Sequence, residues 1–292
     1  MRFMVAREGK DTALYSIDGE SAYRMTGQDG FAGTDLTAAI DAEPAHLSTV
    51  AGNAGDPVPV SSLVPALPFK RFGKILCLGL NYVDHVKEGG YEIPTYPAMF
   101  VRVPSSMIPA GAPMVKPDCS DRLDYEVELM IVIGRGGRHI SEEDALDHVF
   151  GYTVFNDGSV RDYQRKTHQW TPGKNFDATG AMGPVYVTVD ELPDGASGLN
   201  IQSRLNGKVM QNASTSDMMW SVARTIATVS EFTTLEPGDL IAMGTPPGVG
   251  HARNPPVFMF PGDVVEVEIE NICVCRNPIV SEAEAGRGEA AG

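Results

Sequence analysis

Two glutamates, Glu126 and Glu128, stand two residues apart in a segment that otherwise has the composition of a buried strand. Alternate side chains of a strand leave the same face, so both carboxylates point one way, beside apolar chain where an isolated carboxylate is costly to bury. A hard divalent cation, Mg²⁺ or Mn²⁺, removes that cost and prefers oxygen ligands. Asp157 ends the next apolar run and supplies a third carboxylate. The sequence therefore predicts an open metal site held by these three residues.

A Glu-x-Glu pair alone is also typical of the solvated face of an amphipathic strand. The surrounding residues favour the metal site instead. Lys174 follows further along the chain in a Gly-Lys-Asn segment, and Asp124 and Asp162 add carboxylates that would orient the ligands.

A candidate base lies in the segment 81–90, where His85 and Glu88 are three residues apart. On a short helix the two share a face, so Glu88 would fix the tautomer of His85 and make it a better base toward water. A solvated helix start is the alternative interpretation. The glycine pair at 89–90 favours a mobile lid that carries this dyad over the site.

The loop Gly-Thr-Pro-Pro-Gly-Val-Gly at 244–250 follows another apolar run. No Gly-Lys-Ser/Thr follows it, so it is not a phosphate-binding loop of the P-loop type. It is either a tight turn or a rigid loop that presents Thr245 and backbone N–H groups to a substrate carboxylate.

The composition restricts the partners of these groups. The chain has 292 residues, 42% hydrophobic and 21% charged, as in ordinary globular proteins. A net charge of −15 argues against a nucleic acid or an anionic membrane as the main partner. The first residues show no signal peptide, and the 4 cysteines show neither a disulfide framework nor a CxxC zinc motif. We therefore expect a reduced, cytoplasmic protein that acts on a small molecule.

The elements that position these groups are mostly strands. Short apolar runs between Gly and Pro turns predict a mainly β protein with a few flanking helices (α+β). Residues 1–70 are expected to form a small β-rich N-terminal domain with a linker, 71–281 the main domain, and 282–292 a disordered tail. Helices are expected at 35–41, from 141 onward and over 215–232. Strands are expected at 97–103, 113–116, 125–133, 150–155, 184–189, 200–205, 239–243 and 264–270.

Six ordered motifs resemble the fumarylacetoacetate hydrolase family. They are GLNYVDHVKE, DYEVEL, FNDGSVRDYQ, GKNFDATGAMGP, RLNGKVMQ and GTPPGVG with FMFPGDVVEVEIE, and they cover about residues 70 to 281. The resemblance is to the branch of bacterial acylpyruvases and 2-hydroxyhepta-2,4-diene-1,7-dioate isomerases. It implies a mixed β-roll core, a bound Mg²⁺ or Mn²⁺, and a homodimer. The first 60 or so residues resemble the variable N-terminal extension of bacterial members.

The resemblance also implies roles for individual residues. It matches the metal ligands to Glu126, Glu128 and Asp157. It matches the water-activating dyad and the lysine beside the metal to His85, Glu88 and Lys174. It matches substrate-binding positions to Arg102, Arg161, Gln164 and Thr245. Arg102 replaces a lysine that many members carry, which keeps the cation but changes its geometry.

Such a site fits a 2,4-dioxo acid, such as an acylpyruvate or a fumarylpyruvate-like acid, which chelates the metal through its carboxylate and 2-oxo oxygen. We expect hydrolysis: His85 activates a water that attacks C4, the C3–C4 bond breaks, and pyruvate and a carboxylic acid form through a metal-bound enolate. Decarboxylation of an oxaloacetate-like acid and isomerisation of an unsaturated oxo-diacid in aromatic catabolism reach the same enolate and are the alternatives. A non-enzymatic Ca²⁺-binding module is disfavoured, because the ligands are dispersed and His85 and Lys174 are available for chemistry.

Overall fold

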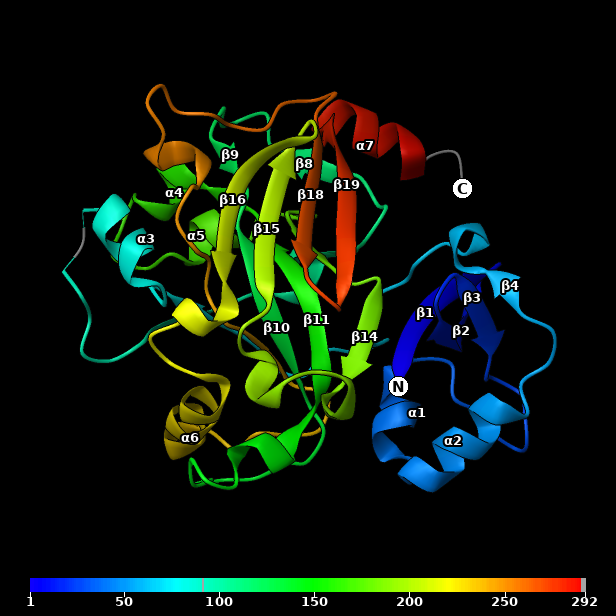
Figure 1. Cartoon of the computed structure of the whole chain (residues 1–292). Coiled ribbons are helices and arrows are strands. Elements are labelled where there is room, and N and C mark those ends of the chain that lie inside the picture. The colour runs from blue at the N-terminus through cyan, green and yellow to red at the C-terminus, as the bar shows by residue number, and fades with distance from the viewer. Residues whose placement is uncertain (91, 290–292) are drawn as a thin grey trace.

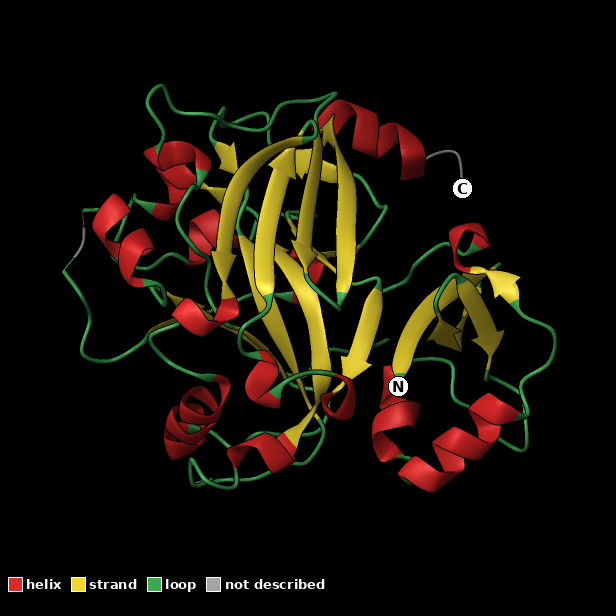
Figure 2. Ribbon diagram, in the orientation of Figure 1, coloured by secondary structure: helices red, strands yellow, loops and turns green. Residues whose placement is uncertain are grey.

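Two β-sheets form the body of the protein, and helices cover its outside (Figure 1, Figure 2). The computed structural model describes residues 1–90 and 92–289. The larger sheet contains β1 (Arg2–Glu8), β2 (Asp11–Asp18), β3 (Ser21–Arg24), β4 (Val58–Pro59), β5 (Ile75–Gly79), β6 (Ala98–Val101), β7 (Met107–Pro109), β10 (Val127–Ile133), β11 (Val149–Asp157), β13 (Gly180–Met182), β14 (Val185–Thr188) and β17 (Leu240–Ala242). Its main path runs β4-β3-β2-β1-β14-β11-β10-β17-β5-β6.

The smaller sheet packs on the centre of the larger one. Its order is β16 (Lys208–Ser214), β15 (Asn200–Leu205), β18 (Val264–Ile269), β19 (Cys273–Ser281) and β8 (Met114–Lys116). A separate pair is formed by β9 (Leu123–Asp124) and β12 (Ser159–Val160). The α-helices are α1 (Leu36–Asp41), α2 (Pro44–Gly52), α3 (Val83–Glu88), α4 (Arg161–Gln164), α5 (Thr171–Lys174), α6 (Val222–Phe232) and α7 (Glu282–Glu289). Every helix among residues 1–90 and 92–289 is too short or too polar to cross a bilayer.

The predicted mainly β class with flanking helices is confirmed. All eight predicted strands are present, with ends within two residues of the prediction. Apolar runs between glycine and proline turns identified them, because a strand buried on both faces is apolar throughout.

β10 connects the packing of the two sheets to the site. All seven of its residues are buried. Its alternate side chains face two different hydrophobic cores: Leu129 and Ile131 face the core shared with the smaller sheet, and Met130 faces the opposite core. Glu126 and Glu128 precede Met130 by four and two residues, so their side chains leave the same face of the chain as Met130. They therefore emerge on the face away from the smaller sheet.

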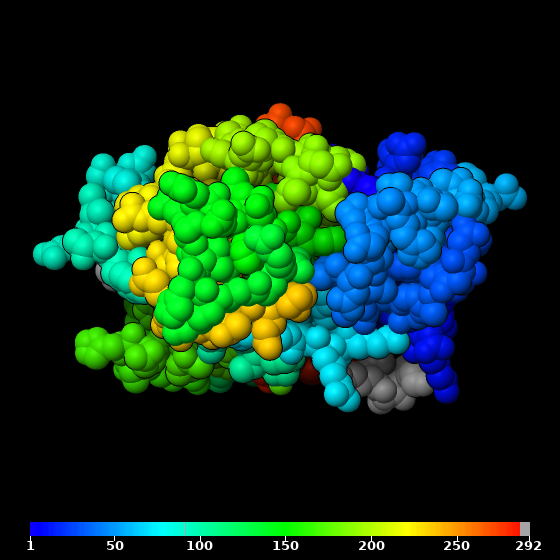
Figure 3. Space-filling model, turned by 90° about the horizontal axis from the view of Figure 1, so that it is seen from below, coloured from blue at the N-terminus to red at the C-terminus, as the bar shows by residue number. Residues whose placement is uncertain are grey.

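The first 70 residues extend the larger sheet. β1 pairs antiparallel with β14 on one side, where Phe3 lies opposite Tyr186, and with β2 on the other. Leu36 of α1 and Leu47 of α2 are buried in the same core as Phe3. Figure 3 shows this N-terminal part, in blue, at one end of the molecule. The predicted boundary at residue 70 therefore separates two parts of one continuous sheet.

The helix predicted over 215–232 is wrong in its first part. A 3-10 turn covers Thr215–Asp217, and α6 begins only at Val222. The reason is Asn81, whose side-chain oxygen accepts the Trp220 N–H at 2.7 Å and whose amide donates to the Trp220 carbonyl at 3.1 Å. These two bonds occupy the backbone N–H and carbonyl of Trp220, which a helix would use for its own hydrogen bonds.

Two further expectations differ from the structure. The helix predicted from Ser141 is a turn followed by a 3-10 helix, Ala145–His148. The tail predicted to be disordered carries α7, and its residues 290–292 lie outside the described chain. Ser281 explains this helix, because its hydroxyl accepts the Glu284 N–H at 3.3 Å and Glu284 in turn accepts the Ser281 N–H at 2.9 Å. This reciprocal capping favours a helix in an Ala/Glu-rich segment.

Candidate active site

The structure brings the three predicted metal ligands together. Glu128 lies on β10, Glu126 directly precedes that strand, and Asp157 ends the antiparallel neighbour β11. One carboxylate oxygen from each residue lies within 4.8 Å of the others. All three side chains are buried. Two neighbouring strands therefore assemble the predicted ligand set.

Lys174, the last residue of α5, lies among these carboxylates. Its Nζ donates to Glu126 Oε2 and to Asp157 Oδ2, each at 2.6 Å. Arg161 Nη1 lies 2.7 Å from the other oxygen of Glu126. Burial raises the pKa of Glu126, but the charges of Arg161 and Lys174 outweigh burial and lower it. Burial lowers the pKa of Lys174, and the Asp157 and Glu126 carboxylates outweigh it and raise it.

The negative charge of Glu128 is less well compensated than the charges of Glu126 and Asp157. Its Oε2 accepts the Gly244 N–H at 2.9 Å, and no Lys or Arg of the described chain lies within ion-pair distance. Burial raises the pKa of Glu128 well above its usual range, and the Asp157 and Glu126 carboxylates raise it further. A buried carboxylate beside two others is costly unless a cation joins them.

The charges of the buried cluster fit a divalent cation. Four carboxylates face three cations, the members being Asp124, Glu126, Glu128 and Asp157 against Arg102, Arg161 and Lys174. Fully ionised, the cluster carries one net negative charge, and a divalent ion would make it one net positive charge. Hard carboxylate oxygens are the ligands that Mg²⁺ and Mn²⁺ prefer. The residues therefore fit such an ion, and the resulting positive excess suits an anionic substrate.

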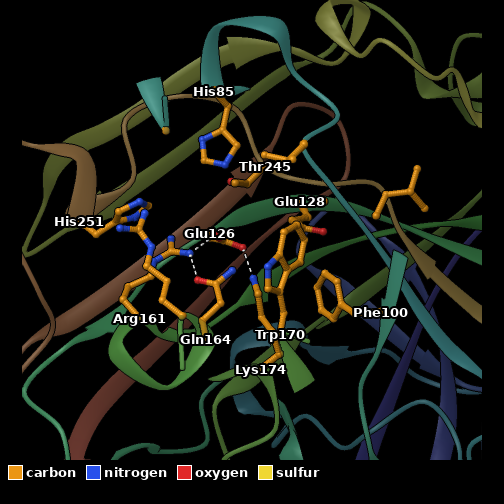
Figure 4. A pocket seen from close by; sticks show the side chains of 15 residues that line it. His85, Phe100, Glu126, Glu128, Arg161, Gln164, Trp170, Lys174, Thr245 and His251 are labelled. Atoms are coloured by element: carbon orange, nitrogen blue, oxygen red, sulfur yellow. Dashed lines mark hydrogen bonds and ion pairs between the residues drawn. The ribbon is translucent and has the colours of Figure 1, made fainter. Parts of the chain in front are cut away.

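The predicted dyad lies over the carboxylates (Figure 4). α3 places His85 there, and its Nδ1 lies 3.5 Å from Glu88 Oε2. The two Glu88 oxygens accept the Gly248 N–H at 3.1 and 3.0 Å. Burial raises the pKa of Glu88, but His85 and this N–H outweigh it and lower it. Glu88 therefore lies beside His85 and fastens α3 to the loop 244–250. His85 Nδ1 is buried and forms no hydrogen bond with the described residues in this position.

A narrow cavity of about 30 Å³ separates His85 from the carboxylates. Phe100 and Trp170 meet edge to face, with ring centroids 5.7 Å apart, and form its apolar wall. Arg161 and His251 form the opposite, polar wall (Figure 4). Sequence reasoning missed Phe100, Trp170 and His251 as lining residues.

Gln164 is at the cavity as predicted. Its side-chain oxygen accepts Arg161 Nη1 at 3.0 Å, and its amide N–H groups have no partner among the described residues. A close approach of two short helices brings it there: a Cβ on Gly173 of α5 would lie 2.3 Å from the Gln164 nitrogen. Gln164 therefore offers two free donors to a substrate.

Thr245 also lines the cavity, but its hydroxyl is engaged. It donates to the Val127 carbonyl at 2.9 Å and accepts Gln211 Nε2 at 2.7 Å. Thr245 therefore anchors the loop 244–250 to the start of β10, and its hydroxyl proton is not available for the substrate contact predicted from the sequence.

Arg102 lies behind Asp157 and does not line the cavity. Its guanidinium donates to Asp157, to Ser106 Oγ at 3.1 Å, to Thr179 Oγ1 at 2.9 Å and to the Gly158 carbonyl at 3.2 Å. This differs from the predicted substrate contact, because these bonds direct Arg102 to Asp157, one of the three predicted metal ligands. We therefore expect Arg102 to position Asp157.

Arg102→Lys is expected to weaken Mg²⁺ or Mn²⁺ binding about 10- to 100-fold, the range for residues that orient a metal ligand. Lysine keeps the charge but cannot bond Asp157, Ser106 and Thr179 together. Calorimetric metal titration measures the effect, with Arg204→Lys on the surface of β15 as control. An unchanged metal affinity with a weakened substrate affinity would contradict this role.

Asp124 joins the polar wall to the loop after residue 250. It accepts Arg161 Nε at 2.8 Å, the Gly250 N–H at 2.8 Å and the His251 N–H at 3.0 Å, and it lies 3.3 Å from His251 Nδ1. Burial raises its pKa, but the contacts with Arg161 and His251 outweigh burial and lower it. This carboxylate therefore fixes the side chains of both Arg161 and His251.

Known proteins are similar to this chain in sequence and in fold. The model of the fumarylacetoacetate (FAA) hydrolase C-terminal family matches residues 74–280. The chain is 46% identical over 215 residues to the mitochondrial oxaloacetate tautomerase fahd2 of Xenopus laevis, covering 73% of this chain and 67% of that protein. It is 44% identical over 225 residues to the human mitochondrial oxaloacetate tautomerase FAHD2A, covering 76% and 71%.

Solved structures agree over nearly the whole chain. The fumarylacetoacetate hydrolase from psychrophilic Exiguobacterium antarcticum superposes with a TM-score of 0.83 at 32% identity, covering 97% of this chain and 100% of that one. The 2-hydroxyhepta-2,4-diene-1,7-dioate isomerase of Mycobacterium marinum gives 0.76 at 30% identity, covering 97% and 99%. The chain belongs to the fumarylacetoacetate hydrolase family.

Proposed function

We propose that this protein is a Mg²⁺- or Mn²⁺-dependent enzyme that interconverts the keto and enol forms of an oxaloacetate-type 2-oxo acid. The observation that carries the proposal is the placement of one base, His85, over a buried set of hard oxygen ligands. A bound divalent ion would supply Lewis acidity toward the carboxylate and 2-oxo oxygens of the substrate. The similarity to oxaloacetate tautomerases over about three quarters of the chain supports this choice of reaction.

Each residue of the site has its own role in the proposed reaction. His85 Nε2 takes the proton from C3 of the keto form and delivers it to the 2-oxo oxygen, which gives the enol, and the reverse reaction returns this proton to C3. Glu88, whose Oε2 lies 3.5 Å from Nδ1, would orient the ring. Free donors of Arg161 and Gln164 hold substrate oxygens, and the Lys174 charge stabilises negative charge that develops beside Glu126. Each proton that leaves carbon therefore has a named acceptor.

Hydrolysis of a 2,4-dioxo acid, the reaction expected from the sequence, is the second candidate. The His85–Glu88 pair favours it, because hydrolysis needs an activated water. Proton transfer within one substrate needs no such additional reactant.

Three substrates separate these reactions. Purified protein with Mg²⁺ is incubated with oxaloacetate, acetylpyruvate and fumarylpyruvate, and enol absorbance, pyruvate and CO₂ are followed separately. We expect faster keto–enol relaxation of oxaloacetate, without pyruvate or CO₂, and no acceleration in EDTA. Pyruvate from acetylpyruvate without faster relaxation would favour the hydrolase, and CO₂ from oxaloacetate would favour a decarboxylase.

His85→Gln is expected to lower kcat by about 10²- to 10⁴-fold, the usual contribution of a general base. Metal affinity should stay within about threefold, because His85 belongs to the lid and not to the ligand set. Steady-state kinetics and metal titration measure the two effects, with His46→Gln on the exposed face of α2 as control. Equal losses in kcat and in metal affinity would exclude a base role.

The four cysteines are free thiols, which supports the proposed cytoplasmic location. The homodimer implied by the resemblance stays a prediction, and gel filtration of the purified chain tests it.

A further inference from the structure

A second cavity adjoins the catalytic one. Its volume is about 230 Å³, against about 30 Å³ for the catalytic cavity. Three residues line both cavities: Arg161, Arg165 and His251. The second cavity therefore offers room to the part of a substrate that extends beyond its reacting end.

The wall of the second cavity is cationic. Arg122 and Arg165 line it with exposed side chains, and neither guanidinium has an ion-pair or hydrogen-bond partner in the described part of the chain. Asp162 is the single carboxylate among the described lining residues, and it accepts the Ser120 hydroxyl at 2.6 Å. In a chain with a net charge of −15, this wall is a local positive focus for anions.

Arg161 lines both cavities, and Figure 4 shows it beside His251 in the catalytic one. Its Nε and Nη1 are engaged by Asp124, Gln164 and Glu126. Its Nη2 is buried and has no hydrogen-bond partner among the described residues. Leaving such a buried donor unsatisfied is costly. An anionic oxygen of a ligand would satisfy it.

The remaining lining gives this site a fixed shape. His251 lines both cavities, and Asp124 holds its backbone N–H at 3.0 Å and its Nδ1 at 3.3 Å. Pro256 and Phe258 form the apolar part of the wall. The site therefore combines positive charge with a surface that accepts methylene groups.

We propose that Arg122, Arg165, His251 and Arg161 Nη2 form a subsite for the distal carboxylate of a 2-oxo dicarboxylate, whose 2-oxo acid end occupies the catalytic cavity. This inference rests on the proposed function, because it takes that end as bound at the metal site. Arg122 and Arg165 are specificity residues: they distinguish a dianion from a monoanion and take no part in proton transfer.

Two matched probes test the subsite. 2-Oxoadipate and 2-oxohexanoate have the same number of carbons and differ in a terminal carboxylate against a methyl group. Calorimetry with the full chain and Mg²⁺ measures both affinities. We expect 2-oxoadipate to bind at least about tenfold more tightly, with a preference that falls as salt is raised, because the two arginines are exposed.

Arg165→Gln is expected to reduce the preference for 2-oxoadipate to within about threefold, and Arg122→Gln to reduce it in part. Lys208→Gln is the matched control, because it removes one exposed cation from β16, away from the cavity. Equal affinities in the unaltered chain, or a preference that survives Arg165→Gln, would overturn the proposal. Inorganic phosphate that binds through Arg165 without any preference for 2-oxoadipate would overturn it as well.

The same measurements separate this inference from the proposed function. If no 2-oxo acid is turned over but 2-oxoadipate is preferred through Arg165, the subsite stands and the proposed reaction is wrong. If oxaloacetate is interconverted but the preference is absent, the reaction stands and the subsite is wrong.

Discussion

In EDTA, Glu128→Gln is expected to unfold at a higher temperature than the unaltered chain, and with Mg²⁺ it is expected to be inactive. Glu128 is buried beside Glu126 and Asp157, and its hydrogen bond comes from the neutral Gly244 N–H. Glutamine keeps the shape and removes the uncompensated charge, which should stabilise the metal-free protein by about 1–3 kcal/mol. The loss of a ligand should lower activity about a thousandfold, since the metal contributes several kcal/mol to catalysis.

Thermal unfolding with and without Mg²⁺ measures the first effect, and turnover of oxaloacetate measures the second. The unaltered chain should gain stability from Mg²⁺, and Glu128→Gln should gain much less. Glu142→Gln is the control, because Glu142 is exposed in a turn and lines neither cavity of the site. A variant that is less stable in EDTA, or that keeps the full shift with Mg²⁺, would show that Glu128 is not an uncompensated ligand.

Lys174→Met is expected to have the opposite effect on the metal-free protein. Methionine fills similar space, but Glu126 and Asp157 lose the cation that lies 2.6 Å from each of them. Removing one partner of a buried ion pair costs about 3–5 kcal/mol. Saturating Mg²⁺ should restore part of this stability, because the ion brings positive charge to the same carboxylates.

Denaturant unfolding in EDTA and in Mg²⁺ measures this cost, with Lys208→Met as the exposed control. Adding Glu128→Gln to Lys174→Met should offset part of the loss, since both residues belong to one coupled cluster. A loss of less than about 1 kcal/mol in EDTA would mean that water screens the cluster as it screens surface pairs.

The carboxylates of the site were predictable because their signal is local. Glu126 and Glu128 sit two residues apart on an apolar strand, and that spacing fixes their common face wherever the strand lies. Asp157 was identified by its place at the end of the next strand, which pairs antiparallel with the first. The residue types and their spacing along the strands were therefore sufficient to predict these three carboxylates.

The parts that sequence reasoning missed depend on distant contacts. Asn81, 139 residues away in the chain, holds the backbone of Trp220 just before Ser221 caps α6, so the local 3–4 pattern of apolar residues extended the predicted helix too far. Arg102 was predicted to bind the substrate, but its position behind Asp157 follows from its hydrogen bonds to Ser106 and Thr179. His251 had no motif of its own, since only the folded chain brings it to Asp124.

The pairing of β1 with β14 has a consequence for how the chain is made. The Thr188 hydroxyl donates to the Met1 carbonyl at 3.0 Å, across a sequence separation of 187 residues. Synthesis proceeds from the N-terminus, so the edge of β1 that pairs with β14 stays unpaired until β14 has been synthesised. During that interval the nascent strand offers a free edge to other chains.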